Sequence, residues 1–106
     1  MKRIQINKDL IPYYFDILLN QELFRMEIKY NKSADLFTVG LSKNGTLLCE
    51  GEPMIYGIPL FGSIKNEHFP SVTITPIDHS GIVDAVTFDN LGRTVFLMVE
   101  ESAADG

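Results

Sequence analysis

Residues 22–30 read Glu-Leu-Phe-Arg-Met-Glu-Ile-Lys-Tyr, and apolar and polar side chains alternate along this stretch. Alternation at period two places one set of side chains on each side of an extended chain. The apolar set is Phe24, Met26, Ile28 and Tyr30. The stretch therefore predicts a β-strand with one buried face and one solvated face.

Two neighbouring stretches, at residues 14–19 and 36–41, show the same alternation, and residues 46–50 resume a strand. Asn20-Gln21 is placed to form a short turn between the first of these strands and residues 22–30. Asn44-Gly45 separates the last two strands, and this dipeptide is typical of the type I′ hairpin turn, in which both central residues adopt positive φ. Residues 11–50 are therefore predicted to form a four-stranded antiparallel meander.

The region after residue 50 contains many helix and strand breakers. Within it, Gly57 precedes an apolar segment, Ile58, Pro59, Leu60 and Phe61, that could cover the end of a sheet. We also expect one helical turn over residues 60–65.

Alternation returns at residues 70–77, where Val72, Ile74 and Ile77 are expected to face inward. Pro70 and Pro76 favour an edge or a strand end, because proline donates no hydrogen bond to a neighbouring strand. A turn at residues 78–81, a short strand at 83–88 and a final strand at 93–101 complete the prediction.

A tight turn is predicted between those last two strands, at Phe88, Asp89, Asn90, Leu91 and Gly92. Glycine adopts positive φ at little steric cost, and Asp or Asn side chains accept backbone N–H groups in turns. We expect Gly92 to have a positive φ and the Asp89 carboxylate to accept a backbone N–H. Phe88 and Leu91 would anchor the turn on the core.

These elements give the fold class. Strands about ten residues apart, without helical periodicity, predict an all-β protein: a small antiparallel β-sandwich or barrel of about seven strands. The 106 residues fit one domain, 1–106. Residues 1–11 would be an N-terminal extension or a first strand, and residues 102–106 a frayed tail.

Charge is distributed unevenly along the chain. The net charge is −5, made up of +1 over residues 1–50 and −6 over residues 51–106. Nucleic-acid binding needs clustered cations, so we expect no specific nucleic-acid binding. The basic start of the chain is not followed by an apolar run, and no stretch is long and apolar enough for a membrane span. We therefore expect a protein that is not secreted and has no membrane partner.

Catalytic and metal-binding patterns are weak. His68 and His79 are eleven positions apart in turn-like segments, and a cation site of Asp78, His79 and Asp84 is the best that the sequence offers. No serine has a nucleophile-elbow context. Cys49 is expected to be a small core residue, a reactive thiol being the alternative. We predict no catalytic residue, no cofactor and no metal.

In the order and spacing of four features, residues 12–100 resemble the baseplate plug proteins of contractile-tailed phages, typified by a cyanophage baseplate plug. These features are an N-terminal β pair ending at residues 24–30, the hairpin at 43–45, the segment 57–60, and the turn 88–92 with its closing strand 94–99. Residues 1–11 are longer than the usual start of the family.

The resemblance implies a structural virion protein at the centre of the baseplate, near the tail-tube end, that is made in the host cytoplasm. Its partners would be other baseplate hub and tail-tube proteins, and a homo-oligomer in the assembled particle is compatible with it. Residues 57–60 and 88–92 are carried over as family motifs, the turn as a structural element and an interface. The family pattern supplies no catalytic residue. The alternatives are a small cytoplasmic β-barrel enzyme and a ligand-binding or adaptor domain, which would need a polar pocket or an exposed strand edge.

Overall fold

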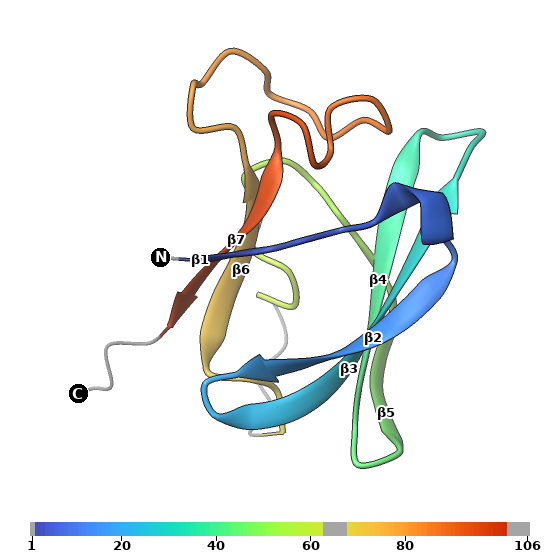
Figure 1. The fold of residues 1–106 in the computed structure, drawn as a ribbon, viewed down its shortest axis with the longest axis vertical. Coiled ribbons are helices and arrows are strands. Elements are labelled where there is room, and N and C mark those ends of the chain that lie inside the picture. Colours follow the sequence, from blue (N-terminus) through green and yellow to red (C-terminus); the bar gives the residue numbers. More distant parts are fainter. Residues whose placement is uncertain (1, 63–67, 102–106) are drawn as a thin grey trace.

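Seven β-strands form two antiparallel sheets in the computed structural model, which describes residues 2–62 and 68–101 (Figure 1). One sheet has the strand order β2-β3-β4-β5 and the other has the order β1-β7-β6. The elements are β1 (Lys2–Ile4), the 3₁₀-helix η1 (Lys8–Leu10), β2 (Tyr13–Leu19), β3 (Glu22–Asn31), β4 (Leu36–Lys43), β5 (Thr46–Pro53), β6 (Val72–Ile77) and β7 (Phe96–Glu101). The all-β prediction is confirmed.

The four-stranded sheet is the predicted meander. Two-residue turns connect β2 to β3 and β4 to β5, and all four turn residues have positive φ: 52° at Asn20, 69° at Gln21, 53° at Asn44 and 79° at Gly45. This backbone twist matches the twist of paired strands. The predicted alternation is also confirmed, because Phe24, Met26 and Ile28 are at most 1% exposed whereas the residues between them face outward.

The three-stranded sheet joins both ends of the chain. β1 comes from the N-terminal extension and pairs with β7, so this extension supplies the first strand. β6 lies at the edge of the sheet, which is one of the two positions that Pro70 and Pro76 favoured. Ile77, which we expected to face inward, is not the last inward residue of β6. The strand has no break, so every second residue faces the core, and the buried positions are Ile74 and Pro76.

Two predicted elements beyond residue 80 are wrong. Residues 83–88 form no strand, and the last strand begins at Phe96 and not at 93. The backbone from 90 to 95 folds back on itself: the Asn90 carbonyl accepts from the amides of Arg93, Thr94 and Val95, each at 3.0 Å. These turn bonds use groups that a strand ladder would need. Residues 60–62 form a turn, and the rest of the predicted helical turn, like the predicted tail at 102–106, lies outside the described residues.

The core lies between the two sheets. Phe24, Phe37 and Val39 of the meander and Leu97 and Val99 of β7 are at most 2% exposed and belong to one apolar cluster. Because the described strands remain in two separate sheets with buried inner faces, the packing is sandwich-like and not a closed barrel. Among the described residues, no helix has the length and apolar character to cross a membrane.

Candidate docking surface

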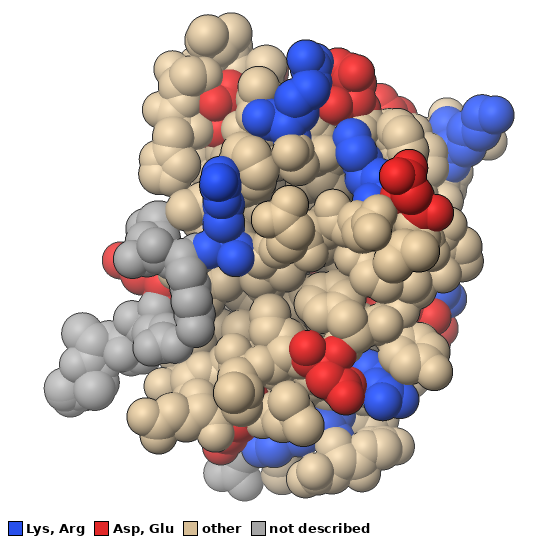
Figure 2. Space-filling view, in the orientation of Figure 1, with Lys and Arg blue, Asp and Glu red and all other residues tan. Residues whose placement is uncertain are grey.

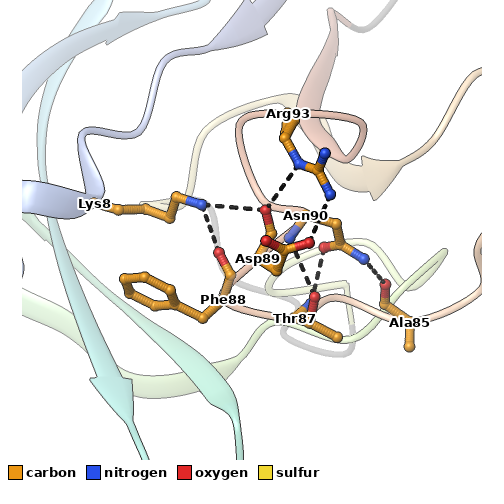
Figure 3. A network of polar contacts seen from close by, with 7 residues as sticks. All are labelled: Lys8, Ala85, Thr87, Phe88, Asp89, Asn90 and Arg93. Carbon is orange, nitrogen blue, oxygen red and sulfur yellow. Dashed lines mark hydrogen bonds and ion pairs between the residues drawn. The ribbon is translucent and has the colours of Figure 1, made fainter.

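The loop before β7 is organised around Asn90, which is 8% exposed (Figure 3). Its Oδ1 accepts from the Thr87 amide at 2.9 Å, and the Asn90 amide donates to Thr87 Oγ1 at 3.2 Å. Its Nδ2 donates to the Ala85 carbonyl at 2.9 Å. Together with the three amides bound by its own carbonyl, these contacts make Asn90 the centre of the loop.

Two predictions for this turn have different outcomes. Gly92 has a φ of +85°, as predicted. The prediction for Asp89 is wrong: its carboxylate accepts from Arg93 Nη2 at 2.6 Å, with the Asp89 side chain 81% exposed. Asn90, one position later, faces the protein interior together with buried Leu91, so the amide-binding role falls to Asn90.

The loop is attached through Phe88 to the end of β3 and the start of β4. The Phe88 ring lies 4.9 Å from the Tyr30 ring and 6.0 Å from the Phe37 ring, measured between centroids. Asp35 Oδ1 accepts from the Phe88 amide at 2.9 Å and from the Tyr30 hydroxyl at 2.6 Å. The Tyr30 hydroxyl, and then the Phe88 amide, lower the pKa of Asp35, while the bond to Asp35 raises the pKa of Tyr30. The two expected anchors of the turn therefore differ: Leu91 is buried, whereas Phe88 is 42% exposed.

Lys8 connects the N-terminal segment to the same loop. Its Nζ donates to the Phe88 carbonyl at 2.5 Å and to the Asp89 carbonyl at 3.4 Å, and lies 4.9 Å from the centre of the Phe88 ring. Asn7 caps η1 by accepting from the Asp9 amide, which fixes the backbone beside Lys8. Three segments far apart in sequence therefore meet at Phe88.

A surface pocket of about 430 Å³ lies where these segments meet. Its lining residues are Lys8, Ile11, Pro12, Lys29, Tyr30 and Phe88. Ring faces and aliphatic groups, including the stem of Lys29, form the apolar part, and the Lys8 ammonium supplies positive charge. The Lys29 ammonium lies 3.7 Å from Glu50 Oε2 and 4.0 Å from Glu27 Oε1. This combination suits an apolar side chain of a partner protein with a carboxylate nearby. We refer to these six residues as the Phe88 pocket.

The second predicted segment, residues 57–60, lies on the other sheet. The Gly57 amide donates to the Pro76 carbonyl at 2.9 Å, and the Leu60 amide donates to the Ile74 carbonyl at 2.7 Å. Leu60 is buried, whereas Ile58 is 56% exposed. The segment therefore covers the edge of β6, where we had expected it to cover the end of a sheet. Residues 57–60 and 88–92 contact different elements and do not form one site.

Asp78, one of the three residues of the possible cation site, has a structural role. Asp78 is 5% exposed and its Oδ1 accepts from the Ser80 amide and hydroxyl at 2.9 and 2.6 Å. The hydrogen bonds that Ser80 donates lower the pKa of Asp78. The amides of Val83 and Ile82 lower it by a smaller amount. Within residues 2–62 and 68–101, no three His, Cys, Asp or Glu side chains are grouped to hold a metal ion. Cys49 packs against the core, and burial raises its thiol pKa, which favours the unreactive protonated form.

Of the residues that build this surface, the sequence singled out Phe88 as a site residue. It did not single out Tyr30 and Asp35 or the other lining residues, Lys8, Ile11, Pro12 and Lys29. Lys8 was one of many surface cations and Asp35 one of several polar loop residues. Their importance depends on contacts with Phe88, which is 53 positions from Asp35 and 80 from Lys8. The signals in the sequence were only that Asp35 lies in a polar loop and Tyr30 ends an alternating strand.

No curated protein matches the chain. A family model described as "Cyanophage baseplate Pam3 plug gp18" matches residues 1–102. The match covers both sheets, the Phe88 pocket and the segment 57–60, and it includes the N-terminal strand that our own comparison had left outside. The chain therefore belongs to the cyanophage baseplate plug family.

Proposed function

We propose that this chain is a structural component of a phage tail baseplate that plugs or lines the central hub near the tail-tube end. The observation that carries the proposal is the family match over residues 1–102. A plug must keep its shape while neighbouring proteins press against it. The sandwich-like core and the loop held by Asn90 suit that requirement.

The proposed partners are other baseplate hub and tail-tube proteins, and the Phe88 pocket is the proposed contact surface. Phe88 is 42% exposed although its ring is held by Tyr30 and Phe37. An aromatic group that is both fixed and accessible loses little conformational entropy on binding, which is typical of interface anchors. Residues 88–92 would thus mainly stabilise the fold, and their second role would be to form part of an interface.

We propose no catalytic activity. The carboxylate of Asp78 and the amide of Asn90 bind backbone groups of their own loops. Such groups stabilise the fold and are not free to act on a substrate. The protein would be made in the host cytoplasm and then enter the virion.

Deletion of the gene in the phage tests this function. We expect particles with incomplete or uninfective tails, restored by the wild-type gene supplied in trans, and the protein present in purified baseplates. Normal tails and full infectivity after deletion, with the protein absent from purified particles, would overturn the proposal.

A pair of lysine variants tests the contact surface. Lys29 lines the Phe88 pocket, whereas Lys32 is exposed in the turn between β3 and β4. We expect Lys29→Ala to reduce incorporation into baseplates and Lys32→Ala to leave it unchanged, with similar melting temperatures for both. Equal incorporation of the two variants would exclude the Phe88 pocket as the contact surface.

A further inference from the structure

In residues 2–62 and 68–101, three of the four sheet edges carry features that prevent strand pairing. β1 has only three residues. β6 contains Pro76 and is covered by residues 57–60. β5 has register shifts against β4, a Gly51 φ of +77° and a terminal Pro53. Short edges, prolines and bulges are the usual means by which natural sheets avoid edge-to-edge association.

β2 is different. It has seven residues in unbroken register with β3 and contains neither proline nor glycine. Among the strands that the structure describes, β3 is its one neighbour, so the other edge of β2 faces away from the sheet. An edge of this length and regularity can accept another strand.

The hairpin geometry shows which backbone groups face outward. A two-residue turn makes the residues on either side of it, Leu19 and Glu22, a hydrogen-bonded pair, and such pairs alternate along an antiparallel ladder. The amides and carbonyls of Tyr14, Asp16 and Leu18 therefore point away from β3. In the part of the chain that the structure describes, no hydrogen bond outside the strand ladders involves these backbone groups.

The core is also incomplete beside this edge. The inward side chains of β2 at Tyr13, Phe15 and Ile17 are only half-buried, whereas Met26 and Ile28 on β3 are fully buried. A further strand with apolar inward side chains would cover the three half-buried groups. The edge therefore offers both backbone groups and apolar surface to an incoming segment.

Charge indicates what kind of segment fits. Asp16 lies in the middle of the edge and its Oδ1 accepts from Arg25 Nε at 3.0 Å, with about half of each side chain exposed. Antiparallel pairing of two copies centred on the outward groups would place Asp16 opposite Asp16, and like charges in that position are unfavourable. The chain carries a net charge of −5, which adds to the repulsion between copies.

We propose that the free edge of β2 accepts an extended segment of a neighbouring baseplate protein as a fifth strand of the sheet. The segment would place apolar side chains over Tyr13, Phe15 and Ile17, and a lysine or arginine opposite Asp16. This inference rests on the proposed function, because it takes the partner from the baseplate.

A proline variant and a matched alanine variant test the edge. Leu18 is 60% exposed, so both Leu18→Pro and Leu18→Ala remove the same side chain. Only the proline also removes an amide that points away from β3, and it leaves the ladder with β3 intact. We expect the incorporation of Leu18→Pro into baseplates to fall by about tenfold or more, the effect of losing about 1.4 kcal/mol, and that of Leu18→Ala to stay near the wild-type level. Melting curves must show both variants folded at the assay temperature; if Leu18→Pro is unfolded, the exchange experiment below decides.

Hydrogen exchange of the wild-type protein gives a direct readout. In the isolated chain, the amides of Tyr14, Asp16 and Leu18 should exchange within seconds, whereas those of Phe15 and Ile17 should be protected by β3. In purified baseplates, all five should be protected. Fast exchange at Tyr14, Asp16 and Leu18 inside the baseplate would overturn the inference while leaving the proposed function intact.

Charge reversal and sedimentation separate the possible occupants. Asp16→Lys should reduce incorporation more than Asp16→Asn, because it places the new lysine opposite the lysine or arginine of the partner segment. Equal incorporation of both would exclude a basic partner residue. If the isolated protein sediments as a dimer that Leu18→Pro dissociates, the edge binds a second copy and the proposed partner is wrong. Absence of the wild-type protein from baseplates would instead refute the proposed function.

Discussion

At the residue scale, Asn90 and Asp89 are neighbours with very different environments. Asn90→Ala removes the acceptor for the Thr87 amide and the donor for the Ala85 carbonyl in a buried site. We expect the free energy of unfolding to fall by about 2 kcal/mol, the typical effect of leaving buried polar groups unpaired. Asp89→Ala, which removes an exposed ion pair with Arg93, should cost less than about 0.5 kcal/mol. Urea denaturation of both variants measures the difference, and equal losses would contradict this role for Asn90.

Gly92 is required by its backbone angle and not by lack of space. A Cβ there would lie 3.8 Å from the Ile6 carbonyl oxygen, an ordinary contact, but φ is +85°. We expect Gly92→Val to reduce the free energy of unfolding by roughly 1–3 kcal/mol, because a β-branched residue is strained at positive φ. Gly92→Asn should cost less, since asparagine tolerates this conformation. If thermal melts show the same loss of stability for both variants, contact of the new side chain with its neighbours, and not the backbone angle, is the cause.

Asp35 should make the stability of the protein depend on pH. The bonds from Tyr30 and Phe88 lower its folded-state pKa below the usual 3.8, so the unfolded chain binds the proton more readily. The stabilisation is therefore complete above that value and decreases as the pH falls through the folded-state pKa. The melting temperature of the wild type should exceed that of Asp35→Asn near pH 6, and the gap should narrow towards pH 3. If the difference in melting temperature between the two proteins stays constant with pH, the ionised carboxylate of Asp35 is not its source.

At the element scale, the β2–β3 hairpin closes with a turn that its sequence fits poorly. Gln21 has a φ of 69°, a position that glycine occupies in the β4–β5 turn, where Gly45 has a φ of 79°. Gln21→Gly should raise the free energy of unfolding by about 0.5–1 kcal/mol, because relief of the left-handed strain exceeds the entropy that glycine adds to the unfolded chain. Gln21→Ala keeps the strain and is the control. Chemical denaturation that ranked alanine at or above glycine would show that the turn is not strained.

At the scale of the whole molecule, charge argues against nucleic-acid binding. Acidic and basic side chains are intermixed over the face seen in Figure 2, which has no continuous basic patch, and the net charge is −5. We expect no binding of double-stranded DNA in a filter assay at physiological salt, because counterion release requires several clustered cations. Salt-sensitive binding at micromolar concentrations would contradict this expectation.

The sequence by itself determined the meander, the Asn44-Gly45 turn and the positive φ of Gly92, and it limited β6 to an edge or a strand end. These features depend on local rules: period-two alternation, the φ preferences of Asn and Gly, and the missing amide of proline. Only the tertiary structure decided that β1 pairs with β7, that residues 83–88 form no strand, and that Lys8 and Asp35 meet at Phe88. In each of these cases, a backbone or side-chain group binds a partner far away in the chain or is used by a turn. Alternation along a segment shows which side is apolar, but it carries no information about which distant segment will pair with it.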